Sequence, residues 1–420
     1  MKRYDILIVG AGPAGLAAAH AAATQGASVG IIDDNPLAGG QIWRGGPELQ
    51  SDARAPQLWH ALQRTDNVEF LLQTRVMYAP QPKQLLVQTP SSSATLSYEK
   101  LILATGARER LLPFPGWTLP GVTGAGGLQA LAKGGYPLQG KRVVVAGSGP
   151  LLLAAAATLQ AKGAQIVAII EQANTPSLLR FGFGLLATPS KIAQALRLMA
   201  QLRGVPYLRD SYVHSARGDG TLQSVQVQRG AARGQETLQC DFLACGYGLL
   251  PNVELAQALG CATATRDAQT VVTVDEWQHT TVDGIYCAGE GTGVGGVDLA
   301  LAEGHIAGLA ASGQHAQAKA LFAARASWQK FAGRLARAFA LRAGLSALAG
   351  DDTIVCRCED VCHGELRTHT GWRSAKLQTR CGMGPCQGRI CGGATEILYG
   401  WRPDTVRMPI SPTRIASIID

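Results

Sequence analysis

The most reactive side chains in the sequence are cysteines gathered late in the chain. The chain contains ten cysteines, and six of them fall between residues 356 and 391. The first two form a Cys-x-Cys pair and the last two a Cys-x4-Cys pair. Four thiolates can hold two iron ions and their bridging sulfides. The spacing therefore predicts a [2Fe–2S] site whose ligands are Cys356, Cys358, Cys386 and Cys391.

Other uses of these cysteines stay open at the sequence level. Cys381 could replace either of the last two ligands, and Cys362 is expected to be a bystander. Structural zinc is the main rival, but zinc usually takes Cys-x2–4-Cys pairs, and a single intervening residue fits a tetrahedral ion poorly. Disulfides are disfavoured because clustered cysteines in a cytosolic enzyme point to metal.

A second kind of chemistry is indicated by glycines at the start of the chain. Gly10, Gly12 and Gly15 complete a G-x-G-x-x-G pattern between an apolar run over 4–9 and an Ala-rich stretch over 14–25. In a strand–turn–helix unit, these glycines allow a tight turn and the close approach of a pyrophosphate, which the start of the helix then holds. A further apolar run, 28–33, ends in an acid suited to ribose hydroxyls. The expected dinucleotide contacts are Gly10, Gly12, Pro13, Ala14, Gly15, Asp33 and Asp34.

Segments farther along the chain favour FAD as this dinucleotide. Residues 101–106 resemble the strand and turn that close over FAD in flavoproteins with two dinucleotide folds, and 281–290 resemble their late flavin motif, followed by a helix over about 298–311. In that motif the final acid binds the ribityl chain. No Cys-x-x-Cys occurs before residue 330, which excludes the dithiol of disulfide reductases, and 39–42 are expected to line the flavin instead. The additional FAD contacts predicted are Gly40, Gln41, Ala104, Thr105, Gly106, Gly289 and Glu290.

A second strand–turn–helix–strand unit begins near residue 141. Its turn carries glycines, but Leu152 stands where the third glycine would be, and a bulkier side chain there separates helix from strand. No arginine closely follows the acid that ends the next strand, so NADP is disfavoured. Three alternatives therefore remain open for this second fold: it binds NAD, it binds ATP, or it is an empty structural domain. The candidate residues are Gly147, Gly149, Pro150 and Glu171.

Composition places these motifs in a multidomain α/β protein. The chain has 420 residues, 46% of them hydrophobic, and 51 glycines. The net charge of +8 comes without a long Lys/Arg run, which suits anionic cofactors or an acidic partner and argues against nucleic acid. The first residues are expected to form a strand and not a signal peptide. No apolar stretch reaches the ~20 residues that a membrane span needs. We expect a cytoplasmic protein, with peripheral association at the inner membrane through a complex left open.

Taken in order, the motifs resemble one family over nearly the whole chain. They are 10–15, 39–41, 104–110, 115–117 with 120–122, 147–150, 246–248 with 251–252, 289–290, 356–359 and 382–389. This pattern resembles the α (A) subunit of opine oxidases, cis-4-hydroxy-D-proline dehydrogenase and hydrogen cyanide synthase. The last two motifs look like the [2Fe–2S] domain of the bacterioferritin-associated-ferredoxin type.

The resemblance implies an oxidoreductase subunit that carries FAD and the cluster. A partner β subunit of the DAO-like amine oxidase type, with its own FAD, would oxidise an amine or an imino or amino acid. A small ferredoxin-like subunit is a further option. Electrons would leave to a dye or quinone, and no catalytic residue is expected in this chain. The alternatives are a self-contained NADH-dependent flavin/iron–sulfur reductase and a non-catalytic scaffold that binds nucleotide and cluster.

The expected fold class is therefore α/β, with two Rossmann-like domains of the glutathione/thioredoxin-reductase type and a small C-terminal [2Fe–2S] domain. We expect the FAD domain over 1–112 and 271–315 and the second dinucleotide domain over 113–270. A helical linker, including a basic amphipathic helix over 321–345, should span 316–350. The cluster domain and tail should cover 351–420.

Overall fold

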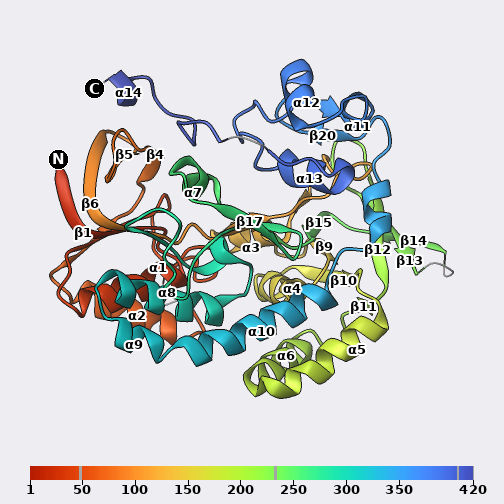
Figure 1. The fold of residues 1–420 in the computed structure, drawn as a ribbon. Coiled ribbons are helices and arrows are strands. Elements are labelled where there is room, and N and C mark those ends of the chain that lie inside the picture. The colour runs from red at the N-terminus through yellow and green to blue at the C-terminus, as the bar shows by residue number, and fades with distance from the viewer. Residues whose placement is uncertain (47–49, 231–233, 404–405, 420) are drawn as a thin grey trace. The chain divides into compact units, whose positions relative to one another are not determined.

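The computed structural model describes residues 1–46, 50–230, 234–403 and 406–419. The chain divides into two compact units. The first unit comprises Met1–Arg108, Leu250–Gly333 and Thr405–Asp420, and the second comprises Glu109–Leu249 and Arg334–Asp404. Both are built on a largely parallel sheet, as the two glycine motifs predict (Figure 1).

The first unit is organised around a seven-stranded sheet in the order β3-β2-β1-β6-β5-β4, with β19 paired to β6. Strands β1, β2, β3, β6 and β19 run parallel, whereas β4 and β5 continue the sheet antiparallel to the long β6. The paired parts of β1, β2 and β6 are mostly apolar and buried, as expected for parallel strands covered on both faces. Their bounds are β1 Lys2–Val9, β2 Val29–Ile32, β3 Val68–Leu71, β4 Arg75–Tyr78, β5 Gln84–Gln88, β6 Ser93–Leu103 and β19 Ile285–Cys287.

Helices α1 (Pro13–Ala23) and α8 (Val297–Ala311) pack closely against each other. Small residues make this possible: a Cβ on Gly304 would lie 2.2 Å from the Ala14 carbonyl oxygen, and one on Gly308 2.2 Å from that of Ala18. The close packing fixes the start of α8 relative to the first glycine turn. The remaining elements of the unit are α2 Arg54–Gln63, α7 Glu254–Ala258, β17 Thr263–Arg266, β18 Gln269–Val272, η3 Gly289–Thr292, α9 His315–Lys319 and α14 Ala416–Ile419.

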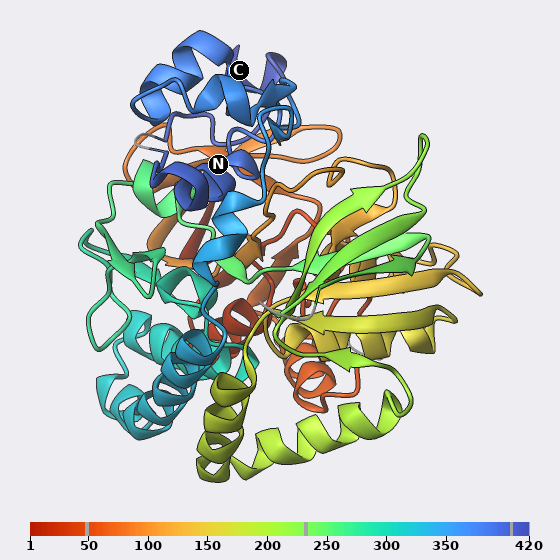
Figure 2. The same ribbon diagram turned by 90° about the vertical axis from the view of Figure 1, so that its right-hand side faces the viewer.

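The second unit contains a five-stranded parallel sheet in the order β11-β10-β9-β15-β8. A three-stranded antiparallel sheet, β12-β13-β14, lies beside it (Figure 2). The strands are β8 Val122–Gly124, β9 Arg142–Gly147, β10 Gln165–Glu171, β11 Tyr207–Leu208, β12 Ser211–Arg217, β13 Ser224–Arg229, β14 Gln235–Gln239 and β15 Phe242–Gly246. The short strands β7 (Ala107–Glu109) and β16 (Leu249–Pro251) pair with each other.

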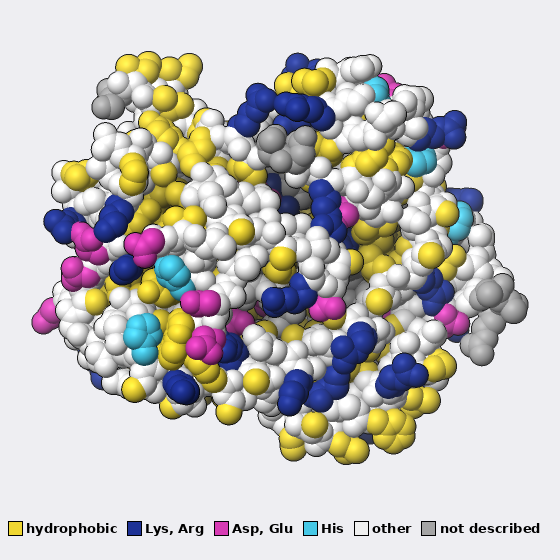
Figure 3. All heavy atoms as spheres, in the orientation of Figure 1, with side chains coloured by type: hydrophobic (Ala, Val, Ile, Leu, Met, Phe, Trp, Pro, Cys, Tyr) yellow, Lys and Arg dark blue, Asp and Glu magenta, His cyan; other side chains and the backbone are white. Residues whose placement is uncertain are grey.

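Helices α3 (Ala125–Lys133) and α4 (Leu151–Ala161) bury their apolar faces in this unit, but α5 and α6 do not. All residues of α5 (Thr175–Gly184) and α6 (Pro189–Gln201) are exposed or half-buried. With η2 (Leu185–Ala187) between them, they present apolar side chains to solvent, visible at the lower right of Figure 3. We call this the α5–α6 surface; its large exposed apolar residues are Leu179, Phe183, Leu186, Leu196 and Met199.

The cysteine-rich segment also belongs to the second unit. It has its own small core around Trp372 and Leu366. The Trp117 indole N–H also donates to the Ile354 carbonyl oxygen at 2.6 Å, which ties the segment to the rest of the unit. Its elements are η4 Ala343–Ala347, β20 Ile354–Cys356, β21 Val361–Cys362, α11 His363–Leu366, α12 Trp372–Thr379 and α13 Cys391–Tyr399.

Two features differ from the sequence expectations. The expected helix over 321–345 is wrong at its end: α10 spans Phe322–Ala338, because the next residues leave the helix to bond with other parts of the second unit. In addition, α7, β17 and β18 group with the first unit, since Val253, Leu255 and Val272 join a core with residues of the first sheet.

Among the described residues, no helix combines the length and apolar character that crossing a bilayer requires.

Candidate functional site

The first glycine turn joins the carboxyl end of β1 to α1. Gly10 has φ +108°, and a Cβ there would lie 2.2 Å from the Ala104 carbonyl oxygen. A Cβ on Gly15 would lie 1.8 Å from the Gly10 carbonyl oxygen. Gly12 is different: the nearest atom to an added Cβ is the Gly40 Cα at 3.8 Å. The protein therefore requires glycine at two positions, while the third leaves an open space where a pyrophosphate could approach.

The start of α1 is free to hold an anion. Gly12 is the N-cap and has no side chain to cap the helix, and Pro13 occupies the first turn. The first N–H groups of a helix have no partner within it, and the helix dipole adds positive potential there. Ala14, on the same turn, lies beside Gly289, whose added Cβ would be 2.8 Å from the Ala14 Cβ. Predicted contacts from distant segments are thus brought together here.

Asp33 follows β2 and is 7% exposed. One carboxylate oxygen accepts from the Ala11 N–H at 2.7 Å, and the other accepts from the Asn35 N–H at 2.9 Å. The acid thus braces the glycine turn and remains at the edge where a ribose would lie. Asp34 instead points outward and pairs with Arg75 at 3.4 Å.

Residues 104–106 continue from β6 beside the glycine turn. Thr105 donates its hydroxyl to the Asn252 carbonyl oxygen at 2.7 Å, and the Asn252 side-chain amide donates back to the Thr105 carbonyl oxygen at 2.9 Å. Gly106 has φ +67° and no atom near an added Cβ. The loop is therefore held from one side and open on the other. Gln41, also a predicted contact, is exposed and accepts from Arg44 at 2.8 Å.

Two acids hold the segment that leads into α8: Glu290 lies in η3, before the helix, and Glu303 lies in the middle of α8. The Glu290 carboxylate accepts from the backbone N–H groups of Gly296 at 3.0 Å and Gly295 at 3.2 Å, and burial raises its pKa to about 7. Glu303 is 2% exposed and accepts from the Gly289 N–H at 2.9 Å and the Thr292 hydroxyl at 2.7 Å. Burial also raises the pKa of Glu303 to about 7. Glu303 thus holds the loop that carries the predicted ribityl contact.

These residues fit FAD: the turn leaves room for a pyrophosphate, α1 offers N–H groups, and an acid ends β2. FAD bound there would supply reversible two-electron and one-electron redox chemistry. The turn at 10–15, the loop at 104–106 and the start of α8 would bind and orient it.

The second glycine turn joins β9 to α4 and differs from the first. Gly147 and Gly149 are buried, whereas Pro150 is exposed. Glu171 ends β10, is fully buried, and accepts from the Gly149 and Ala173 N–H groups, each at 2.8 Å. Burial raises the pKa of Glu171 to about 6. Leu152 is buried over Gly246, where an added Cβ would lie 3.2 Å from the leucine side chain, so a distant glycine makes room for its bulk.

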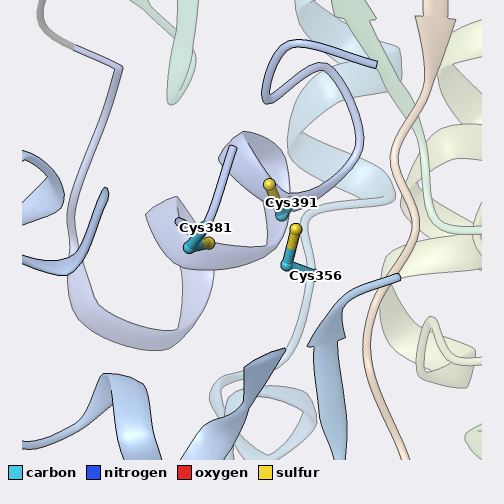
Figure 4. Close-up of side chains that lie close together, drawn as sticks. All are labelled: Cys356, Cys381 and Cys391. Atoms are coloured by element: carbon cyan, nitrogen blue, oxygen red, sulfur yellow. The ribbon is translucent and has the colours of Figure 1, made fainter. Parts of the chain in front are cut away.

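The cysteines gather around one cavity in the second unit. The sulfur atoms of Cys356, Cys381 and Cys391 lie within 4.8 Å of one another, from the end of β20, the loop after α12 and the start of α13 (Figure 4). A cavity of about 210 Å³ adjoins them. Its lining residues are Leu111, Cys356, Arg357, Cys358, Cys386, Ile390 and Cys391.

All four cysteines predicted as ligands therefore line the cavity, and Cys381 does not. Glycine lets the loop close in: a Cβ on Gly384 would lie 2.3 Å from the Cys358 Cβ. Cys362 lies apart, with its thiol directed to the Asp352 carbonyl oxygen at 3.6 Å.

The thiols lie close enough to shift one another's pKa values in opposite directions. Hydrogen bonds from Cys381 and Cys391 lower the pKa of Cys356, and a bond from Cys391 lowers the pKa of Cys386. The pKa values of Cys358, Cys381 and Cys391 are raised. Thiolates are the form that binds metal, and four cysteines around one cavity fit the donor set of an iron–sulfur cluster.

Two features escaped the sequence motifs. Glu303 could have been noticed as an acid in the middle of a largely apolar helix, since a buried charge needs partners. The contacts of residues 339–342 with the second glycine turn carry no motif, because serine, glutamine and backbone carbonyls are common everywhere.

Comparisons with known proteins agree with this geometry. Residues 4–318 match the family model of pyridine nucleotide-disulphide oxidoreductases. The opine oxidase A subunit of Agrobacterium tumefaciens (strain Ach5) is 31% identical over 99% of this chain and 91% of its own length. The hydrogen cyanide synthase subunit HcnB of Pseudomonas aeruginosa is 32% identical over 97% of this chain and 96% of its own.

A solved structure extends the likeness to the whole fold. L-proline dehydrogenase from P. horikoshii superposes with a TM-score of 0.71 at 20% identity, covering 99% of this chain and 80% of that one. At this identity the match speaks for the fold alone, including its late segment.

Proposed function

The chain belongs to the pyridine nucleotide-disulphide oxidoreductase family, and within it to the group that contains the opine oxidase A subunit and HcnB of hydrogen cyanide synthase; from this premise we propose that it is the electron-transferring subunit of a hetero-oligomeric flavoprotein dehydrogenase. The proposed donor is an amine or an imino or amino acid, oxidised at a partner β subunit that carries its own FAD. A dye or quinone would accept the electrons.

The observation that supports this proposal is that one chain contains both an open glycine turn and a cavity lined by cysteines, each a candidate site for a redox cofactor. The first unit offers the open turn at Gly12, and the second offers a cavity lined by four cysteines. FAD and a [2Fe–2S] cluster would together convert a two-electron donor into single-electron steps. The chain's own residues would bind and orient the two groups: backbone N–H groups and Asp33 at the first site, and thiolates at the second.

The α5–α6 surface supports a partner protein. It exposes Phe183 and Leu186 strongly, and the sequence between Glu171 and Asp210 contains only basic charged residues. Arg180, Arg197 and Arg203 are exposed among the apolar side chains. Exposed apolar patches rimmed by charge mark interaction sites. We therefore propose that the partner protein binds the α5–α6 surface, through an apolar face of its own that carries acidic residues.

The test is partner-dependent dye reduction. The chain is purified from its native source under anoxic conditions, and the co-purifying chain is identified. Substrate candidates (opines, hydroxyprolines, proline, glycine) are then tested with a dye, with each chain alone and with both. We expect substantial dye reduction only with both. Full activity from this chain alone would refute the proposal, and rapid anaerobic bleaching of its flavin by NADH would favour the self-contained reductase.

A further inference from the structure

The two glycine turns are built alike, so their surroundings can be compared directly. In each, the acid at the end of the second strand braces the turn through backbone N–H groups: Asp33 with Ala11 and Asn35, Glu171 with Gly149 and Ala173. Yet Gly12 is half-buried and Gly149 is buried. Something covers the second turn.

The cover is the chain's own segment after α10. Ser148 donates its hydroxyl to the Phe339 carbonyl oxygen at 2.9 Å. The Phe339 ring lies 3.7 Å from the position of a Cβ on Gly149 and meets the Phe181 ring edge-on, with centroids 5.1 Å apart. A backbone carbonyl and an aromatic ring thus occupy the face of the turn that a pyrophosphate and ribose would approach.

The same segment continues past the end of β10. The Gln172 side-chain amide donates to the Ala340 carbonyl oxygen at 3.0 Å and to the Ser148 hydroxyl at 2.9 Å. Its carbonyl oxygen accepts from the Arg342 N–H at 3.1 Å. Gln172 is 1% exposed, so these bonds form away from water. A buried amide with all its groups engaged leaves little freedom to receive another ligand.

Arg342 attaches the end of the segment to the residues that follow β10 and β11. Its guanidinium bonds the Gln172 backbone carbonyl and pairs with Asp210, and it lies over the Tyr212 ring, 5.4 Å from the centroid. Ser148, Gln172 and Asp210 follow the neighbouring parallel strands β9, β10 and β11. In a doubly wound sheet, the adenosine half of a dinucleotide lies across these carboxyl ends.

We propose that Phe339–Arg342 is an internal ligand of the second fold: the peptide fills the adenosine site, so the chain excludes NAD(H), NADP(H) and ATP there and accepts a dinucleotide only at its first fold. Ser148 and Gln172 are the residues that recognise the peptide backbone. The inference is independent of the proposed function, since it concerns only which nucleotides the chain admits.

Competition follows from the shared atoms. A nucleotide at the second turn would need the Gly149 face and the space beside Gln172, which the segment already fills. The apparent affinity for the nucleotide equals its affinity for the open site multiplied by the fraction of molecules in which the segment is released. Releasing the segment should therefore raise nucleotide affinity, while a change on α10 that leaves these contacts intact should not.

The experiment uses the full-length chain with its cofactors bound. Binding of NADH and ATP is measured by equilibrium dialysis, and we expect no saturable binding up to about 1 mM. The double variant Phe339→Ala/Arg342→Ala should bind ATP at least about ten-fold more tightly. Arg337→Ala, which removes an exposed arginine of α10, is the matched control and should behave as wild type.

A second measurement does not depend on the variant folding. Hydrogen exchange of wild type should show residues 339–342 protected to the same degree with and without ATP. One adenine nucleotide bound per chain beyond FAD, lost in Glu171→Gln, would overturn the inference, as would a released segment in the double variant without any gain in binding. FAD content, iron content and partner-dependent dye reduction are measured on the same samples; their loss would count against the proposed function and leave this inference standing.

Discussion

At the scale of single residues, the four cysteines on the cavity wall should be separable from the two others. Replacing any one of Cys356, Cys358, Cys386 or Cys391 with serine should remove most bound iron, because a [2Fe–2S] cluster needs four ligands. Iron analysis and the visible spectrum of anoxically prepared protein give the measurement.

Cys362→Ser is the control and should keep full iron, since its thiol points to the Asp352 carbonyl oxygen. Cys381→Ser should also keep it, because Cys381 is buried and does not line the cavity, although its sulfur lies within 4.8 Å of those of Cys356 and Cys391. Loss of the cluster in Cys381→Ser alone would show that the ligand assignment is wrong, and zinc in place of iron would remove the redox role altogether.

Glu303 should make stability depend on pH. Burial raises its pKa from 4.5 to about 7 in the folded chain, so folding disfavours the charged form. The stability associated with the neutral acid is complete below pH 4.5 and is lost as pH rises through about 7. Glu303→Gln stays neutral and still accepts from the Gly289 N–H.

We therefore expect Glu303→Gln to be more stable than wild type by about 3 kcal/mol at high pH, with no difference near pH 4. Chemical unfolding at several pH values measures this. The exposed Glu276→Gln is the control for replacing a glutamate by glutamine and should keep wild-type stability. A Glu303→Gln variant less stable than wild type throughout would mean that the carboxylate's hydrogen bonds outweigh its burial.

At the scale of elements, the first turn contains glycines needed for two different reasons. Gly10→Ala should lower the free energy of unfolding by more than about 3 kcal/mol, because the methyl group meets the Ala104 carbonyl oxygen and φ is +108°. Gly12→Val should leave the fold intact but lose FAD, because only ligand space is filled. Thermal unfolding and the flavin spectrum distinguish them; normal FAD content in Gly12→Val would place the pyrophosphate elsewhere.

The sequence predicts the elements that carry a local signal. It predicts strand, turn, helix and acid for both folds, and α1, α4, α8, β1, β2, β9 and β10 lie where expected within a few residues. The glycines at these turns can be recognised because only they tolerate the backbone there.

Long-range choices cannot be read from local patterns. The end of α10 at Ala338 depends on Ser148 and Gln172, whose bonds to the next residues span 191 and 168 positions in sequence. The grouping of 250–270 with the first sheet likewise depends on apolar contacts that no local pattern marks. For the cysteines, spacing favours four over six, but only the folded loop shows that Cys381 lies within 4.8 Å of Cys356 and Cys391 without lining the cavity.

At the scale of the whole molecule, the α5–α6 surface should decide whether the chain finds its partner. Phe183→Ser/Leu186→Ser removes two strongly exposed apolar side chains and should weaken partner binding at least about ten-fold. Co-purification and analytical ultracentrifugation measure the loss, while FAD and iron content should be unchanged.

Leu377→Ser is the matched control, since Leu377 is 72% exposed, like Phe183 at 73%, but lies on α12. It should bind the partner normally. Unchanged partner binding by the double variant would place the interface elsewhere, and its loss of binding to anionic vesicles instead would identify a membrane surface as the true occupant.

The end of the chain belongs to the first unit, not to the cysteine-rich segment that precedes it. The Ile410 N–H donates to the Met77 carbonyl oxygen at 3.0 Å, and Arg414 bonds the carbonyl oxygens of Thr89 and Pro90. Both termini are therefore anchored on the flavin fold. An affinity tag or dye placed at either end would therefore report on the first unit. Removing residues 406–419 would remove contacts from the first unit and would leave the cysteine-rich segment in place.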